Sequence, residues 1–169
     1  MNRFKALLRN DDGVAAVEFA MLVFPFLLFL FCILDMALMF FVDSALDSAL
    51  HMAAREVRVG TAHSGSWDLA KFKSTVCNNM ALSFGCEDEL LVTTTTMSDF
   101  SSMSFTSAVS GGVLSVSESF SPGSSGDYVM IQAFLPWSSL LAKLGADVNT
   151  LADGSYVLSA AAVFRNEPF

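Results

Sequence analysis

The stretch Asp11-Asp12-Gly13-Val14-Ala15-Ala16-Val17-Glu18-Phe19-Ala20 marks the border between a short charged leader and a long apolar segment. Within Val14–Val42 only Glu18 and Asp35 carry charge. The uninterrupted apolar part, Phe19–Leu34, would measure about 24 Å as a helix. Flanking apolar residues lengthen it enough to cross a bilayer core. We therefore expect a membrane-spanning helix, in which the lone acid Glu18 is costly unless a charged group pairs with it.

The apolar segment has two other interpretations, a core helix of a soluble protein and a cleaved secretory signal. A core helix of a soluble protein is usually shorter than this run. A cleaved secretory signal needs a short apolar region followed by small residues at the cleavage site. Phe24-Pro25-Phe26 and Phe29–Phe31 carry the run further, and Asp35-Met36-Ala37 offers no such site. We expect the segment to remain in the mature protein, with a kink near Pro25 because proline cannot donate to the helix ladder.

The leader, Met1–Gly13, carries an excess of basic side chains close to the apolar segment. Its three bases are Arg3, Lys5 and Arg9, and its two acids are Asp11 and Asp12. Basic residues beside a membrane span favour a cytoplasmic location for that end of the chain.

From Met36 onward the pattern becomes that of an amphipathic helix. Apolar residues recur at spacings of three and four, at Leu38, Val42, Ala45, Leu46, Ala49, Leu50, Ala53 and Val57. A second set four residues apart, Asp43, Asp47, His51 and Arg55, predicts a solvated charged face. His51 is thus expected to be an exposed helix residue and not a ligand or base. Gly60 is the expected stop, so one helix should extend from Val14 to Val59.

The residues after Gly60 predict a small α+β domain. We expect a second helix over 66–84, an acidic turn at Glu87–Glu89, and strands at 90–97, 128–135 and 156–164, the second stopped by Pro136-Trp137. The Ser/Gly-rich stretch 98–126 should form a loop with short strands near 103–106 and 113–116, and a helical turn should cover 138–144. Helices followed by strands favour an antiparallel sheet.

Three cysteines are present, and none has the spacing of a zinc or thioredoxin-type site. Cys32 lies in the apolar segment. In an oxidising compartment Cys77 and Cys86 would form a disulfide, whereas in a reducing one they would remain thiols. The bond would close a loop of about nine residues and add about 2–3 kcal/mol to the stability of the domain.

Composition and motifs exclude several functions. The net charge is −8 and the pI about 4.5, so no basic surface is available for nucleic acid. No nucleophile elbow, phosphate-binding loop, metalloprotease or dinucleotide motif occurs. We expect no cofactor, no metal site and no catalytic residue. Glu87–Glu89 is expected to be a solvated turn, and Thr93–Thr96 an exposed strand face.

The border stretch resembles the processing site of type IVb pilins and pseudopilins of the Tad (tight adherence, Flp) system. That site is a glycine, four residues, a glutamate and a Tyr or Phe, matched here by Gly13, Glu18 and Phe19. The run with Pro25, the continuation Asp47–Arg58 and the closing stretch Ala160–Phe169 are similar to the TadE-like family in particular.

The resemblance implies cleavage after Gly13 by a prepilin peptidase, so that the mature chain starts at Val14. It implies that Glu18 pairs with the α-amine of a neighbouring subunit during assembly. The chain would then have a cytoplasmic leader (1–13), a transmembrane and spine helix (14–60) and a periplasmic domain (61–169) at a bacterial inner membrane. Its partners would be the peptidase and other pseudopilins or pilins. A distal domain of about a hundred residues fits a minor pseudopilin better than the short major pilins.

Other functions remain open from the sequence. A membrane-anchored adhesin or envelope binding protein would use the loop 98–126 and an exposed Trp67 or Trp137. An anchored enzyme lacks site residues. The TadG-like relatives are a further possibility within the pilus system, although they are usually longer.

Overall fold

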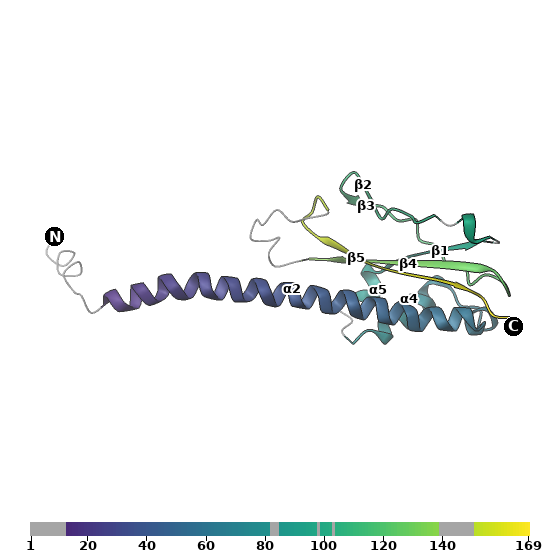
Figure 1. The fold of residues 1–169 in the computed structure, drawn as a ribbon, viewed down its shortest axis with the longest axis horizontal. Coiled ribbons are helices and arrows are strands. Elements are labelled where there is room, and N and C mark those ends of the chain that lie inside the picture. The colour runs from purple at the N-terminus through teal and green to yellow at the C-terminus, as the bar shows by residue number, and fades with distance from the viewer. Residues whose placement is uncertain (1–12, 82–84, 98, 103, 139–150) are drawn as a thin grey trace. The chain divides into compact units, whose positions relative to one another are not determined.

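The computed structural model describes residues 13–81, 85–97, 99–102, 104–138 and 151–169 (Figure 1). The chain divides into an N-terminal unit, Met1–Ala37, and a C-terminal unit, Leu38–Phe169. The division falls inside helix α2, which spans Val14–Arg58 and contributes to both units. Short helices and small antiparallel sheets follow, and the predicted α+β class with a long N-terminal apolar helix is confirmed.

Helix α2 matches the predicted helix to within one residue at its end. The helix continues through Pro25, while the predicted kink there stays a prediction. Arg55 and Arg58 lie in the last turn, where positive charge suits the helix dipole. Gly60 follows with a φ of +81°, a conformation that only glycine adopts without strain. A Cβ atom at Gly60 would also overlap the ring of Phe169.

The second predicted helix is shorter than expected. Within the predicted range 66–84 the structure has helix α4 (Leu69–Asn79), and a separate short helix, α3 (Thr61–Ser64), precedes that range. Helix α4 begins after Asp68, whose side chain accepts a hydrogen bond of 2.8 Å from the N–H of Lys71. It ends because Met80 is extended, and residues 82–84 lie outside the described part of the chain. The predicted acidic turn is the short helix α5 (Cys86–Glu89).

The main sheet has the strand order β1-β4-β5, and both strand pairs are antiparallel. Its strands are β1 (Leu91–Met97), β4 (Tyr128–Trp137) and β5 (Tyr156–Arg165). All three were predicted, but the expectation that Pro136-Trp137 stops the second strand is wrong. Pairing between β1 and β4 ends at Leu91 and Phe134, so Pro136 pairs only with Val157 of β5. A proline is tolerated where one side of the strand has no partner.

The Ser/Gly-rich stretch contains less regular structure than predicted. Strand β2 (Val109–Ser110) pairs with β3 (Val113–Leu114), so only the first half of the strand expected at 113–116 forms. A single 3-10 turn, η2, covers Phe100–Ser102. Residues 104–106 form no strand, because the backbone of Thr106 bonds to a side chain, that of Gln132. Met103 and most of the turn expected at 138–144 lie outside the described residues.

One core lies between the C-terminal part of α2, helix α4 and one face of the sheet. Helix α2 supplies Val42, Leu46, Ala49, Leu50, Ala53 and Val57, and the sheet supplies Val92, Val129, Ile131, Ala133, Leu135, Leu158, Ala160 and Ala162. The first set has the helical spacing of the predicted apolar face, and the core residues of β4 and β5 alternate along their strands.

The other face of β4 is buried as well, which the sequence pattern did not indicate. Met130, Gln132 and Phe134 point away from α2 and are buried. Gln132 donates to the carbonyl of Thr106 and accepts from its N–H, which fixes the loop on this face. Thr93, predicted to be exposed, is also buried. Strand β4 is thus buried on both faces, and it lies between β1 and β5 at the centre of the main sheet.

We predict that Leu50→Ala lowers the free energy of unfolding by about 2–5 kcal/mol, because it removes a fully buried side chain and leaves a cavity. Met52→Ala is the matched control, since Met52 lies one half-turn away on the same helix and is 46% exposed. It should change stability by less than about 0.5 kcal/mol. Denaturant titration in detergent measures both, and equal losses would contradict the burial of this face.

Candidate processing and assembly site

The start of α2 brings the predicted site residues together along a single helix. Gly13 precedes the helix, and no atom lies within 4 Å of the position that a Cβ atom would take there. Val14 is the first helical residue. Glu18 is four residues further, about 6 Å along the axis. Gly13, Val14, Glu18 and Phe19 are all exposed, so the peptide bond before Val14 and the carboxylate after it lie open to a partner.

Glu18 has no ionic partner within the described part of the chain. The ion pairs found there are His51–Asp47, Arg58–Glu167 and Lys73–Glu118, all in the C-terminal unit. The first turn of α2 contains no acid, and Glu18 is the first carboxylate of the helix. The other acid of the apolar stretch, Asp35, is buried and makes a polar or electrostatic contact.

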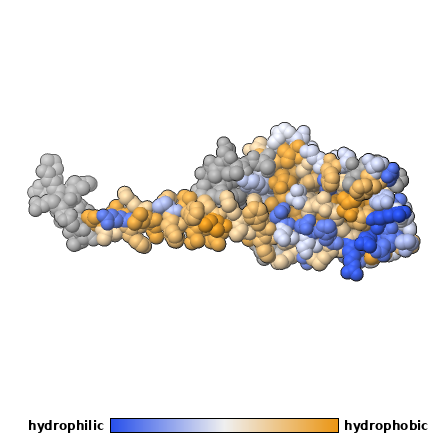
Figure 2. Space-filling view, in the orientation of Figure 1, coloured by the Kyte–Doolittle hydropathy of each residue, from blue (hydrophilic) through white to orange (hydrophobic). Residues whose placement is uncertain are grey.

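Large apolar side chains are exposed along the first part of α2. Eighteen such residues from Val14 to Phe41 are exposed, and Figure 2 shows this segment as a nearly continuous hydrophobic surface. Contiguous apolar surface of this extent marks a membrane or protein contact. Among the described residues α2 is the helix long and apolar enough to cross a bilayer. Length and composition fit a membrane anchor and a signal segment alike.

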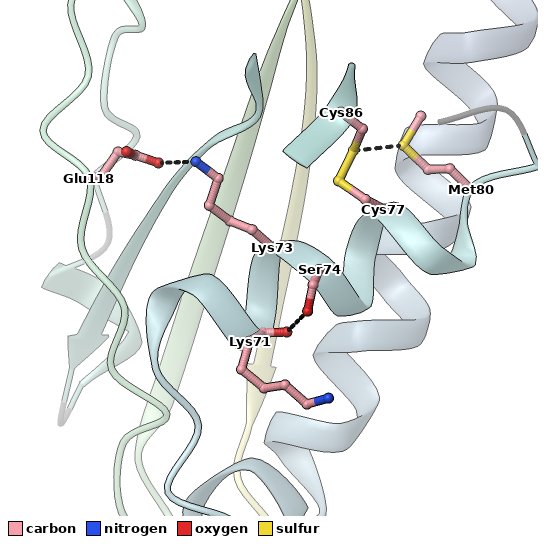
Figure 3. The surroundings of a disulfide bond; sticks show 7 residues. All are labelled: Lys71, Lys73, Ser74, Cys77, Met80, Cys86 and Glu118. Atoms are coloured by element: carbon pink, nitrogen blue, oxygen red, sulfur yellow. Dashed lines mark hydrogen bonds and ion pairs between the residues drawn. A yellow bond between two sulfur atoms is a disulfide. The ribbon is translucent and has the colours of Figure 1, made fainter. Parts of the chain in front are cut away.

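The disulfide predicted in the distal part is present between Cys77 of α4 and Cys86 of α5 (Figure 3). Both residues are almost fully buried. The sulfur of Met80 lies 3.5 Å from that of Cys86.

The remaining candidate side chains, His51, Trp67 and Trp137, form no site within the described residues. His51 is exposed beside Asp47, as predicted, and its Nε2 lies 3.8 Å from the carboxylate. Trp67 and Trp137 are half-buried and pack against the core, so neither is the fully exposed tryptophan that a binding protein would use. No group of three or more His, Cys, Asp or Glu side chains in the described residues is arranged to hold a metal ion.

Two carboxylates outside the candidate site have lowered pKa values. The backbone N–H and hydroxyl of Ser101 donate to Asp99, and those bonds lower its pKa. The hydroxyl and N–H of Ser155 donate to Asp153 and lower its pKa in the same way. Both carboxylates close turns, and neither lies near α2's first turn in the chain.

Comparison with known families identifies the N-terminal part. The family model described as TadE-like protein matches residues 13–55. This segment is TadE-like. The TadE-like segment begins at Gly13 and includes Glu18, Phe19 and Pro25, which confirms the resemblance over these residues. The similarity suggested for 160–169 lies outside the match. No curated protein and no solved structure matches the chain.

The contacts that hold residues 118–121 against β1 were missed by sequence reasoning. They depend on pairs distant in sequence, Phe72 with Phe120 and Lys73 with Glu118. The sequence feature that could have indicated these contacts is Glu118, because it is one of only two acids between residues 98 and 126.

We predict that Leu27→Arg, near the middle of the apolar stretch, raises the free energy of membrane insertion by about 3 kcal/mol. Membrane retention after an alkaline wash, measured by immunoblot, should therefore fall. Ser48→Arg is the control, because Ser48 is an exposed residue of the same helix beyond the apolar part. Full retention of Leu27→Arg would contradict a membrane-spanning role for this segment.

Proposed function

We propose that the chain is a minor pseudopilin, a non-enzymatic component that supports assembly of a Tad/Flp type IVb pilus. The observation that carries the proposal is the Gly13…Glu18-Phe19 border at the start of a TadE-like helix. In this function residues 1–13 are a cytoplasmic leader, 14–60 are the membrane and spine helix, and 61–169 form a periplasmic domain. A prepilin peptidase of the inner membrane removes the leader.

The geometry before Val14 suits that cleavage. Gly13 precedes the helical ladder and has no neighbouring atoms where a side chain would lie. The bond between Gly13 and Val14 lies at the N-terminal end of α2, and both residues are exposed. Cleavage creates an α-amine at the end of the helix where positive charge is disfavoured.

Glu18 supplies the charge that the new amine needs. A buried charge is offset when an opposite charge pairs with it, and an unpaired acid in the membrane is costly. The carboxylate lies exposed on the helix surface and is free of ion pairs within the described residues. A neighbouring subunit's Val14 amine can meet it there, so that cleavage and assembly become linked. Other pseudopilins or pilins of the Tad system are the partners that this contact requires.

A membrane-anchored adhesin or envelope binding protein is the second candidate. The observation that favours it is the exposure of two aromatic side chains, Phe100 and Phe105, on the long Ser/Gly-rich loop. In that function the TadE-like helix would serve only as an anchor, and removal of the leader would be unnecessary.

We predict that Gly13→Ala blocks processing, because an added methyl group at the residue before the cut obstructs the peptidase. The intact mass of the membrane form should remain that of the chain starting at Met1, while the wild type should start at Val14. Ala16→Ser, which leaves the bond unchanged, should be processed normally. A wild-type chain that still begins at Met1 in cells with active peptidase would remove the processing claim, and unchanged function of Gly13→Ala would favour the adhesin.

We predict that Glu18→Gln leaves processing intact and lowers pilus number by at least about tenfold, the effect of losing roughly 1.4 kcal/mol of pairing energy per contact. Asp47→Asn is the control, since Asp47 is an exposed acid on the same helix. Electron microscopy counts pili, and mass spectrometry reads the processing state. Normal piliation with Glu18→Gln would argue against the pairing role.

A further inference from the structure

The outer edge of β1 is covered by residues 118–121, which we call the cover segment. Thr94 donates its N–H to the carbonyl of Ser119 at 3.0 Å, and Ser119 donates its N–H to the carbonyl of Val92 at 3.1 Å. The N–H of Ser121 reaches the hydroxyl of Thr94 at 2.7 Å. These bonds pair backbone groups that an edge strand would otherwise present to other chains.

Helix α4 contacts the cover segment from a second side, through Lys73 and Phe72. Glu118 accepts a hydrogen bond from Nζ of Lys73 at 3.1 Å and from the N–H of Val92 at 3.4 Å, so its carboxylate links α4 to β1. The side chains of Lys73 and Glu118 are only 14% and 30% exposed. Phe120 stacks on the buried Phe72 with ring centroids 4.7 Å apart. Hydroxyl bonds between Ser119 and Thr93 or Thr94 add to the two backbone bonds. The contacts of Glu118 and Phe120 with α4 join this set of bonds to the helix.

Helix α4 is in turn fixed by the disulfide. Cys77 lies one turn after Lys73 on the same helix, and Cys86 begins α5, directly before β1 (Figure 3). The Cα atoms of the two cysteines are 5.7 Å apart. The bond therefore joins the helix that holds the cover segment to the chain that enters the covered strand. Phe72, Lys73 and Cys77 share one short helix of eleven residues.

We propose that the Cys77–Cys86 disulfide controls whether the edge of β1 is covered. Reduction by a dithiol breaks the Sγ–Sγ bond and leaves two thiols, while the dithiol is oxidised to its own disulfide. Helix α4 then loses its link to α5, and its hold on Glu118 and Phe120 weakens. The cover segment opens and exposes the N–H and C=O groups of Val92 and Thr94. The oxidised chain is the form that keeps β1 from pairing with other chains, whether or not the leader has been removed.

Hydrogen exchange of the labelled full chain in detergent micelles, resolved by NMR, tests this proposal. In Cys77→Ala/Cys86→Ala the protection of the Thr94 and Ser119 amides should fall at least about tenfold more than that of amides inside the β4–β5 ladder, as expected for local opening. Glu87→Gln is the control, because it removes an exposed carboxylate of α5 and should change neither amide. Equal loss across the sheet, or no loss at Thr94 and Ser119, overturns the proposal.

A second variant keeps the test decisive if the double alanine chain does not fold. Glu118→Gln/Phe120→Leu retains the disulfide, removes the charge pair with Lys73 and the ring stacking on Phe72, and also alters the bond from the N–H of Val92 to residue 118. The same two amides should lose protection selectively, and light scattering should show association that increases with protein concentration. Unchanged protection in this variant would show that α4 does not hold the cover segment, and the proposal would be wrong.

Discussion

The burial of one face of α2 is the contact on which the C-terminal unit depends. Leu46, Leu50 and Val57 lie at helical spacing and are fully buried between the helix and the sheet. Each such side chain stabilises the fold by roughly 1.5–3 kcal/mol relative to exposure. The same helix continues toward Val14 with its apolar side chains uncovered. The C-terminal part of α2 therefore packs into a protein core, whereas its N-terminal part needs a separate apolar environment.

Periodicity was sufficient to predict the long helix and the three strands of the main sheet. It failed where the outcome depended on neighbours in space. Apolar residues continue past Asn79, yet α4 ends there because Met80 turns into an extended conformation. Pro136 was expected to end β4, because the sequence does not indicate which side of a strand has a partner. The burial of Thr93 depends likewise on segments far away in the chain.

The candidate site was more predictable than the packing around the disulfide. Gly13, Val14 and Glu18 are close in sequence, and a helix converts their spacing directly into distance. The cysteine pair was also visible, because only two cysteines lie outside the apolar segment. The role of Glu118 was not, since it requires Lys73 and the N–H of Val92 to arrive from two other elements. Serine-rich segments carry little periodic signal, and their pairing is decided by tertiary contacts.

The continuity of α2 has a mechanical consequence. A force applied to α2 at Leu38, where the C-terminal unit begins, loads the core contacts of Val42, Leu50 and Val57 together. At its C-terminal end the helix is bonded to Glu167, which lies shortly after the end of β5. Glu167 donates its N–H to the carbonyl of Arg58, and its carboxylate lies 3.0 Å from the Arg58 guanidinium. Tension on the helix therefore reaches the C-terminal end of β5, which pairs with β4 along its whole length.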